Sequence, residues 1–299
     1  MLWICFIGVC FILIIITICM CTRTIHREGM THNPNSLLKL KSLSAIKKNP
    51  DLVNDNLSGV KTYYINLDRA IERNQLMTNE AKDLGISLTR LDAADGKKLK
   101  NLYRGSYKFG DGTVIKYRTK PRGEETFAEL GCMLSHLRSI KHAYDSGDEV
   151  ALILEDDVDL YTIPLWKQTL DEVMDGVGKW GIISLCQLNY NKRKNGIQKV
   201  KTSQAWGCQA YLINRLGMKM VLDAVEWDGD NIFISTHVVD NEKIVSDDWI
   251  NGLILRKGLM YATRPMLLPR ITDDMSSYIN DVHVQHQKGA AEHYIKDYV

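Results

Sequence analysis

Residues 151–154, Ala-Leu-Ile-Leu, form a short apolar run that does not alternate with polar residues. Such a run is typical of a strand covered on both faces, as in a mainly parallel sheet between two layers of helices. The run leads directly into three consecutive carboxylates, Glu155, Asp156 and Asp157. The sequence therefore predicts a buried strand that brings acidic side chains to one edge of a sheet.

Runs rich in β-branched and aromatic residues alternate with helix-like segments along the rest of the chain. Strands are expected at 60–67, 86–93, 151–154, 180–189 and 209–214, and helices at 69–85, 124–147, 215–225 and 247–258. This alternation predicts a mostly parallel, twisted α/β sheet with helices on both faces. Ligands of such sheets bind beyond the carboxyl ends of the strands, where Asp68 and the acidic triplet fall.

The triplet has two interpretations at this stage. A single Asp is enough to cap a following helix, whereas three adjacent carboxylates repel one another and are best tolerated beside a cation. Oxygen ligands suit Mg²⁺, Mn²⁺ or Ca²⁺. The residues alone leave a metal site and a solvated acidic loop as alternatives.

The N-terminal residues from Leu2 to Met20 carry no charged side chain. They match the roughly 20 apolar residues that cross a bilayer as a helix. A cleavable signal peptide is the alternative, but it would need a basic start and a small-residue cleavage site, which this segment lacks. The predicted organisation is a transmembrane anchor (1–22), a polar stem (23–57) and one α/β domain (58–299).

Charge and cysteine content exclude several classes of protein. The formal net charge of +2 is too small to indicate a nucleic-acid partner. Of the seven cysteines, the predicted domain holds Cys132, Cys186 and Cys208, without CxxC spacing, so neither a disulfide framework nor a zinc cluster is indicated. The basic segment Lys97–Arg122 suggests either a solvated loop or a flap over an anionic substrate.

Five blocks of the sequence carry a family likeness. They are YYINLDRAIER, LDAADGKKL, AELGCMLSHLRSI, ALILEDDVDL and QAYLINRLGMKMVL, in that order. Together they resemble glycosyltransferase family 25, which includes lipooligosaccharide and collagen hydroxylysine galactosyltransferases. The resemblance implies a GT-A-like nucleotide-sugar fold and an inverting transfer, usually of galactose from UDP-galactose. The implied acceptor is a hydroxyl of a glycan, a lipid-linked glycan or a hydroxylysine-containing protein.

If the ligand is a nucleotide-sugar donor, the acidic triplet can bind the metal ion that accompanies its diphosphate. Mn²⁺ or Mg²⁺ held by carboxylates can bridge the diphosphate oxygens and neutralise the leaving group. Acid-x-acid spacing on an extended backbone places Glu155 and Asp157 on one side. We therefore expect Asp157 to bind the metal, and Glu155 to contact the metal, its bound water or the ribose. Asp156 is also a predicted donor-site residue, although it can point elsewhere.

Four further residues are candidates for donor binding. Arg69 and Arg73 stand four apart at the start of a helix and suit phosphate oxygens, although a surface ion pair with Glu72 or Asp68 is the alternative. Ser135 and His136 lie within an otherwise apolar helical face. An interior His more often satisfies packing, but the block GCMLSH favours contact with donor or acceptor hydroxyls.

An inverting transfer also needs a general base for the acceptor hydroxyl. Asp248 and Asp247 are the candidates, because they follow Ser246 at an expected helix start, beside Trp249, which suits a sugar ring. The alternative is that both merely cap the helix. The resemblance favours Asp248, and Asp273 and Asp274 are further acids.

Two questions about function and location stay open in the sequence. A metal-dependent phosphohydrolase or a non-catalytic, membrane-tethered sugar-binding or scaffold protein could carry the same carboxylates. Arg23 and Arg27 follow the apolar segment and would place the domain in the cytosol, whereas eukaryotic members of the resembled family work in the secretory lumen. The sequon at Asn56 is compatible with the lumen.

Overall fold

The computed structural model describes residues 34–103, 106–108, 112, 114–116, 124–186, 196–201, 207–228, 231–234 and 246–264. Its helical segments are α2 (Pro34–Lys48), α3 (Leu52–Leu57), α4 (Ile71–Leu84), η1 (Gly96–Lys98), α5 (Glu124–Asp145), η2 (Leu160–Leu165), α6 (Leu170–Asp175), α7 (Arg215–Asp223), η4 (Asp247–Asn251) and α8 (Gly252–Arg256). Its strands are β1 (Lys61–Asn66), β2 (Thr89–Asp92), β3 (Lys100–Tyr103), β4 (Ser106–Lys108), β5 (Val114–Lys116), β6 (Val150–Glu155), β7 (Ile182–Ser184), β8 (Gly196–Lys199), β9 (Ala210–Asn214), β10 (Val225–Asp228), β11 (Asn231–Ile234) and β12 (Met260–Arg264).

The larger sheet has the strand order β2-β1-β6-β9-β7-β12-β8. Strands β2, β1, β6, β7 and β12 run in one direction, while β9 and β8 run antiparallel to their neighbours. The sheet is thus mostly parallel, as the alternation of elements predicts. The reversal at β9 was not predicted, because a buried strand has the same apolar composition in either direction.

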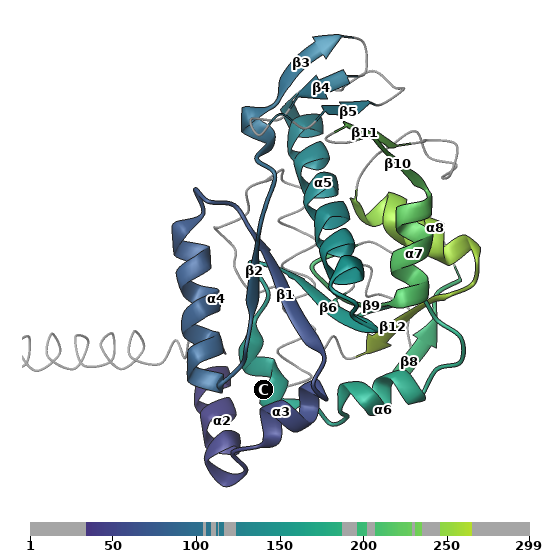
Figure 1. Ribbon diagram of the computed structural model, residues 1–299. Helices are drawn as coiled ribbons and strands as arrows, with labels where there is room; N and C mark the ends of the chain where they lie inside the picture. Colours follow the sequence, from purple (N-terminus) through teal and green to yellow (C-terminus); the bar gives the residue numbers. More distant parts are fainter. Residues whose placement is uncertain are drawn as a thin grey trace, which may run out of the picture.

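Strand β6 is buried on both of its faces, as its sequence predicts. Ala151 and Ile153 point into a core cluster formed with α5, α7, η4 and α8. Leu152 and Leu154 point the opposite way, into a cluster formed with α2, α3, α4, η2 and α6. Figure 1 shows these two groups of helices on opposite sides of the sheet. This three-layered mixed α/β architecture fits a GT-A-like fold.

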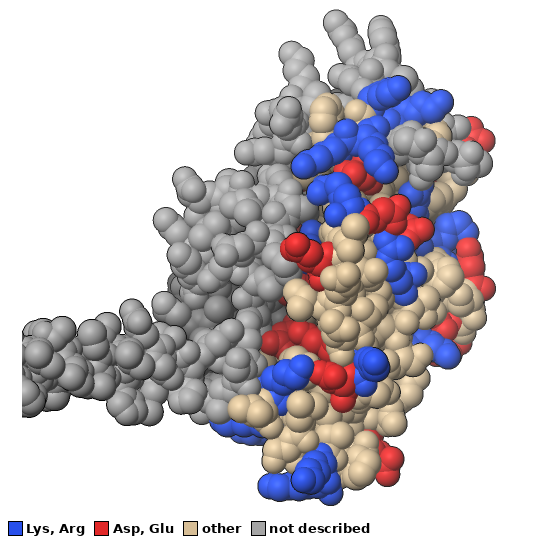
Figure 2. Space-filling view, turned by 90° about the vertical axis from the view of Figure 1, so that its left-hand side faces the viewer, with Lys and Arg blue, Asp and Glu red and all other residues tan. Residues whose placement is uncertain are grey.

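A second sheet, of order β10-β11-β5-β4-β3, lies at the top of Figure 1, beside the N-terminal end of α5. The sequence analysis expected only a basic loop or flap in this part of the chain. A loop is wrong for the described residues, because η1, β3, β4 and β5 form between residues 96 and 116, whereas a flap over an anionic substrate stays a prediction. Lys and Arg side chains gather at this end of the molecule in Figure 2, and its exposed lysines are Lys97, Lys98, Lys100 and Lys108.

Residues 34–57 were expected to be an unpacked stem, which the structure contradicts. Helices α2 and α3 bury Leu38, Val53 and Leu57 in the second core cluster. Asn56 of the sequon is 4% exposed, and its amide donates to the Ile163 carbonyl over 2.7 Å. A buried, hydrogen-bonded amide cannot carry a glycan in the folded domain, so the sequon does not support a lumenal location.

The predicted transmembrane anchor and the first part of the predicted stem, residues 1–33, lie outside the described residues. Among the helices that the structure does describe, none combines the length and the apolar character needed to cross a bilayer.

Two acidic side chains meet where α4 packs on η2. Glu80 Oε2 accepts the Leu160 N–H over 2.9 Å, and Asp159 Oδ1 accepts the Tyr161 N–H over 2.8 Å. Burial raises the pKa of Glu80 to about 8 and that of Asp159 to about 7, and the charge of Asp159 adds to the effect on Glu80. Both carboxyls therefore hold protons in the folded state at pH values where the unfolded chain has released them.

This pair predicts a fall in stability with rising pH. Between the ordinary carboxyl pKa near 4 and about 8, the folded state binds more protons than the unfolded state, so unfolding becomes easier as the pH rises. Glu80→Gln keeps an acceptor for Leu160 and loses the charge, so it should exceed the wild type in stability at pH 8.5 and show a flatter pH dependence. Urea denaturation at pH 5.5, 7 and 8.5 measures this. Glu72→Gln, at an exposed position of α4, is the control, and parallel pH profiles for all three proteins would refute the assignment.

Candidate active site

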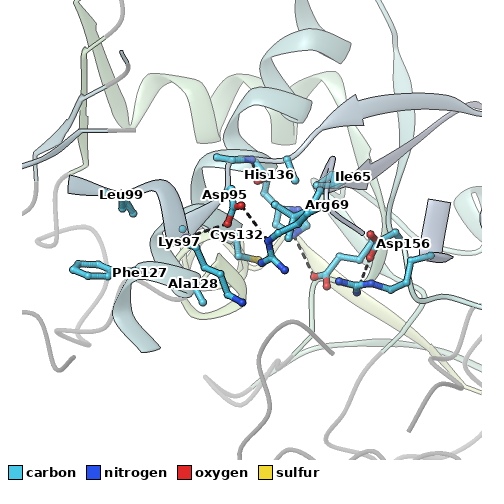
Figure 3. A pocket seen from close by; sticks show the side chains of 17 residues that line it. Ile65, Arg69, Asp95, Lys97, Leu99, Phe127, Ala128, Cys132, His136 and Asp156 are labelled. Carbon is cyan, nitrogen blue, oxygen red and sulfur yellow. Dashed lines mark hydrogen bonds and ion pairs between the residues drawn. The ribbon is translucent and has the colours of Figure 1, made fainter. Parts of the chain in front are cut away.

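A pocket of about 580 Å³ opens beyond the carboxyl ends of β1 and β6. Its other walls are the segment from Ala93 through η1 and one face of α5 (Figure 3). Six of the nine predicted site residues line it: Arg69, Arg73, Ser135, His136, Glu155 and Asp156. The structure thus brings these six residues together at one edge of the sheet, and the volume of the pocket is in the range of small-molecule sites.

One wall of the pocket depends on a close contact between α5 and η1. A Cβ atom on Gly131 would lie 2.6 Å from the Ala94 carbonyl oxygen, and one on Gly96 would lie 2.1 Å from the Phe127 carbonyl oxygen. Ser135 Oγ donates to the Gly131 carbonyl over 2.6 Å and accepts the Ala94 N–H over 2.8 Å. The Ser135 hydroxyl was expected to contact the sugar donor or the acceptor substrate. In the structure it instead makes two hydrogen bonds that hold this wall together.

The contact predicts that α5 does not tolerate a side chain at Gly131. Gly131→Ala should lower the free energy of unfolding by about 1–3 kcal/mol, because the added methyl group meets backbone atoms. Gly178→Ala is the control, since a Cβ there has no atom within 4 Å, and it should change stability by less than about 0.5 kcal/mol. Urea denaturation of both variants tests this, and equal stability would mean that the two segments are not in contact.

Asp156 is the most firmly held member of the acidic triplet. Its Oδ1 lies 2.7 Å from Arg73 Nη1, and its Oδ2 accepts from Asn66 Nδ2 over 2.6 Å. Burial raises the pKa of Asp156, and the Arg73 guanidinium opposes that rise. Arg73 is therefore part of a buried ion pair, rather than of the surface pair with Glu72 or Asp68 considered from the sequence. Asp68 pairs instead with Arg90, at 2.7 Å.

Asp157 does not lie where acid-x-acid spacing placed it. The extended backbone of β6 ends at Glu155, and residues 156–157 form a turn, so the argument from an extended strand does not apply. Asp157 is 6% exposed, its Oδ2 lies 3.7 Å from Arg73 Nη1, and it is not among the residues that line the pocket. Glu155 is the triplet member with the largest exposure toward the pocket, at 25% of its side chain.

Glu155 faces α5 across the pocket. Its Oε1 lies 3.4 Å from Nε2 of His136, and the other ring nitrogen of His136 lies 3.1 Å from the Tyr211 hydroxyl. Cys132 lies one helical turn before His136, and its Sγ is 3.2 Å from Ser246 Oγ. Burial raises the pKa of the Cys132 thiol, and the Glu155 carboxylate raises it further.

Two further cations, Arg69 and Lys97, line the pocket. Arg69 is 41% exposed, and its Nε donates to Asp95 Oδ2 over 3.1 Å. Asp95 Oδ1 also accepts the Lys97 N–H over 3.0 Å, which caps η1. Figure 3 shows the Arg69 and Lys97 side chains extending into the same part of the pocket. Two cations in a concave, solvent-accessible site favour an anionic ligand.

The predicted bases, Asp247 and Asp248, belong to η4 and do not line this pocket. Asp247 accepts two backbone N–H groups, from Gly207 and Asp248, each over 2.9 Å, and burial raises its pKa to about 6. Asp248 is half-buried. The contact of Ser246 with Cys132 brings the start of η4 against the pocket wall. Asp273 and Asp274 lie outside the described residues.

Sequence reasoning missed three residues in or beside the pocket: Asn66, Asp95 and Cys132. Asn66 ends β1, so a rule that polar residues at strand ends face the ligand would have found it. Asp95 lies in the block LDAADGKKL, which was used only for its family likeness, whereas Lys97 was predicted only as part of a basic segment that could cover an anionic substrate. Cys132 was set aside because it lacks a CxxC partner, although the helical spacing to His136 was visible.

Comparison with known proteins shows which family this chain resembles. Residues 60–231 match the family described as glycosyltransferase family 25 (LPS biosynthesis protein). A "Glycosyltransferase 25 family member" of Aedes aegypti is 27% identical over 248 residues, which cover 78% of this chain and 39% of that protein. The Xenopus laevis "Procollagen galactosyltransferase 1-B" is 32% identical over 111 residues, 36% of this chain and 18% of that protein. The chain thus matches less than half the length of these relatives.

Proposed function

The chain belongs to glycosyltransferase family 25, and we propose that it transfers a sugar, galactose first among the candidates, from a UDP-sugar to a hydroxyl group with inversion. The observation that carries this proposal is the pocket at the carboxyl ends of β1 and β6, whose lining includes the carboxylate of Glu155 and the cations of Arg69 and Lys97. A nucleotide sugar offers a diphosphate to such cations and sugar hydroxyls to such carboxylates.

The donor would bind through groups that the fold already holds in place. The Arg69 guanidinium and the Lys97 ammonium can donate to diphosphate oxygens. The Asp95 carboxylate orients the guanidinium by accepting a hydrogen bond from Arg69 Nε. Asn66 and Arg73 hold Asp156 at the carboxyl end of β6, which fixes the backbone next to Glu155. Positioning of this kind lowers the barrier because the reacting groups need no further ordering.

A divalent ion, Mn²⁺ or Mg²⁺, is the proposed cofactor. The carboxylate oxygens of Glu155 suit such an ion and are accessible from the pocket. Asp157 is buried beside Arg73, so its side chain would have to rotate toward the pocket to bind the same ion. When bound, the ion would neutralise the charge that develops on the leaving diphosphate. Asp157 thus stays a proposed ligand, and Glu155 is the residue best placed to hold the metal.

The acceptor hydroxyl must lose a proton on the face opposite the diphosphate. Asp248 is our proposed base, because the family resemblance favours it over Asp247, whose two carboxylate oxygens accept backbone N–H groups. The acceptor is a glycan, a lipid-linked glycan or a hydroxylysine-containing protein. We propose that residues 2–20 anchor the protein in a membrane as a single transmembrane helix. The domain then lies either in the cytosol or in the secretory lumen, and protease protection in sealed microsomes distinguishes the two.

A screen of UDP-sugars with a panel of acceptors, with and without Mn²⁺, tests this function. Transfer to a hydroxyl acceptor with inversion at the anomeric carbon supports it. Release of phosphate from phosphomonoesters or phosphodiesters without sugar transfer would favour the phosphohydrolase alternative. Binding of sugars or UDP without turnover under all conditions would favour the non-catalytic alternative.

A further inference from the structure

Three side chains of types that bind metals converge in the pocket wall, and the proposed function uses only Glu155 of the three. One potential ligand atom from each of Cys132, His136 and Glu155 lies within 4.8 Å of the other two. Cys132 and His136 share one face of α5 because they are four residues apart, and Glu155 reaches them from the end of β6. The cluster therefore combines one sulfur, one nitrogen and one oxygen donor.

The distances suit a tetrahedral ion. Two ligand atoms bound at about 2.1 Å to a tetrahedral metal stand about 3.4 Å apart. The separation between His136 Nε2 and Glu155 Oε1 is 3.4 Å, which is long for a hydrogen bond between these groups. The third ligand atom, Cys132 Sγ, lies within 4.8 Å of the other two. A tetrahedral site with a metal–sulfur bond of about 2.3 Å needs roughly 3.6 Å, so metal binding would draw the thiol closer.

His136 also has the supporting contact that metal-bound histidines use. Its ring is 0% exposed and its Nδ1 lies 3.1 Å from the Tyr211 hydroxyl. If Nδ1 carries the proton and donates it to Tyr211, the lone pair of Nε2 faces Glu155 and Cys132. The ring orientation is thus fixed by packing before any ligand arrives.

We propose that Cys132, His136 and Glu155 form a site for a thiophilic divalent cation, with Zn²⁺ the best fit, and with a fourth coordination position open to the pocket. Thiolate and imidazole ligands select Zn²⁺ over Mg²⁺ or Mn²⁺, and three protein ligands leave one position for water or a ligand. Binding replaces the thiol proton of Cys132 by the metal, so one proton leaves for each ion bound. The site differs from the proposed Mn²⁺ or Mg²⁺ site in using Cys132 and His136, and the two ions would compete for Glu155.

Cobalt(II) substitution tests this proposal without any measurement of transfer. The full chain is used with Cys5, Cys10, Cys19 and Cys21 changed to Ser, because those thiols would bind Co²⁺ themselves. We expect one Co²⁺ per chain, a thiolate-to-cobalt charge-transfer band in the near ultraviolet, and displacement of Co²⁺ by Zn²⁺. Calorimetry in buffers of different ionisation enthalpy should show release of one proton per ion.

The ligand set is assigned with variants. Cys132→Ser should abolish the band, and His136→Gln and Glu155→Gln should each weaken Co²⁺ binding by about 10-fold or more. Cys186→Ser, at a buried thiol in the opposite core cluster, should leave band and affinity unchanged. Circular dichroism confirms that each variant is folded. Absence of the band in the parent protein, its persistence in Cys132→Ser, or its loss in Cys208→Ser but not Cys132→Ser would overturn the proposal.

Discussion

Replacing Arg73 with Met should lower the free energy of unfolding by about 3–5 kcal/mol, because the change leaves a buried carboxylate without its counter-charge. Arg73 and Asp156 are 9% and 7% exposed, and Arg73 Nη1 lies between Asp156 at 2.7 Å and Asp157 at 3.7 Å. The long apolar side chain of Met fills most of the space of the arginine stem, so the loss reports on charge rather than on a cavity.

The pH dependence of the loss identifies its cause. Burial raises the pKa of Asp156 even with Arg73 present, and removal of the guanidinium raises it further. A protonated Asp156 needs no counter-charge, so Arg73→Met should lose less stability at pH 5 than at pH 8. Arg69→Met, which breaks the more exposed pair with Asp95, is the control and should cost no more than about 1 kcal/mol. Equal losses in the two variants would show that the Arg73 pair is not a buried one.

Asp248→Asn should reduce kcat by about 10²- to 10⁴-fold while UDP-sugar affinity stays within a few-fold of the wild type. The asparagine keeps the size of the side chain and removes its ability to take a proton from the acceptor hydroxyl. If Asp248 only caps η4, the variant should instead lose about 1 kcal/mol of stability and turn over normally. Steady-state kinetics, donor titration and melting temperature separate the two roles.

Asp247→Asn is the matched control for this experiment. Asp247 accepts backbone N–H groups with both oxygens, and an amide can replace only one of them, so this variant should lose about 1–3 kcal/mol of stability. A near-normal kcat in Asp248→Asn would remove Asp248 as the base, and a large loss of kcat in a fully stable Asp247→Asn would transfer the role to Asp247.

The sequence predicted the elements of the fold better than their arrangement. The spacing of apolar residues in 124–147 defines α5, and Gly85, with φ of 70°, ends α4 as its position suggests. Asn214 caps α7, its side chain accepting the Gly217 N–H over 2.9 Å. Direction and pairing depend on contacts between distant segments, so neither the reversal of β9 nor the second sheet followed from local patterns.

The site shows the same division between local and long-range information. The ends of the predicted strands pointed to Glu155 and Arg69, which both line the pocket. The five sequence blocks in their order pointed to the family, and that assignment is confirmed. The partner of each side chain was not predictable: Arg73 pairs with Asp156, and Ser135 binds the backbone of Ala94. Those partners come from elements far apart in the chain, and they decide which groups remain available to a ligand.

Titration of UDP into the protein, with Mn²⁺ present, tests most directly whether this pocket binds a nucleotide-sugar donor. Arg69→Ala should weaken UDP binding about 10-fold or more, because a charge-assisted hydrogen bond to phosphate is lost. Lys141→Ala, which removes an α5 lysine paired with Asp145 and outside the pocket lining, should bind as the wild type does. No UDP binding to the wild type, or the same dissociation constant for Arg69→Ala and wild type, would contradict the assignment.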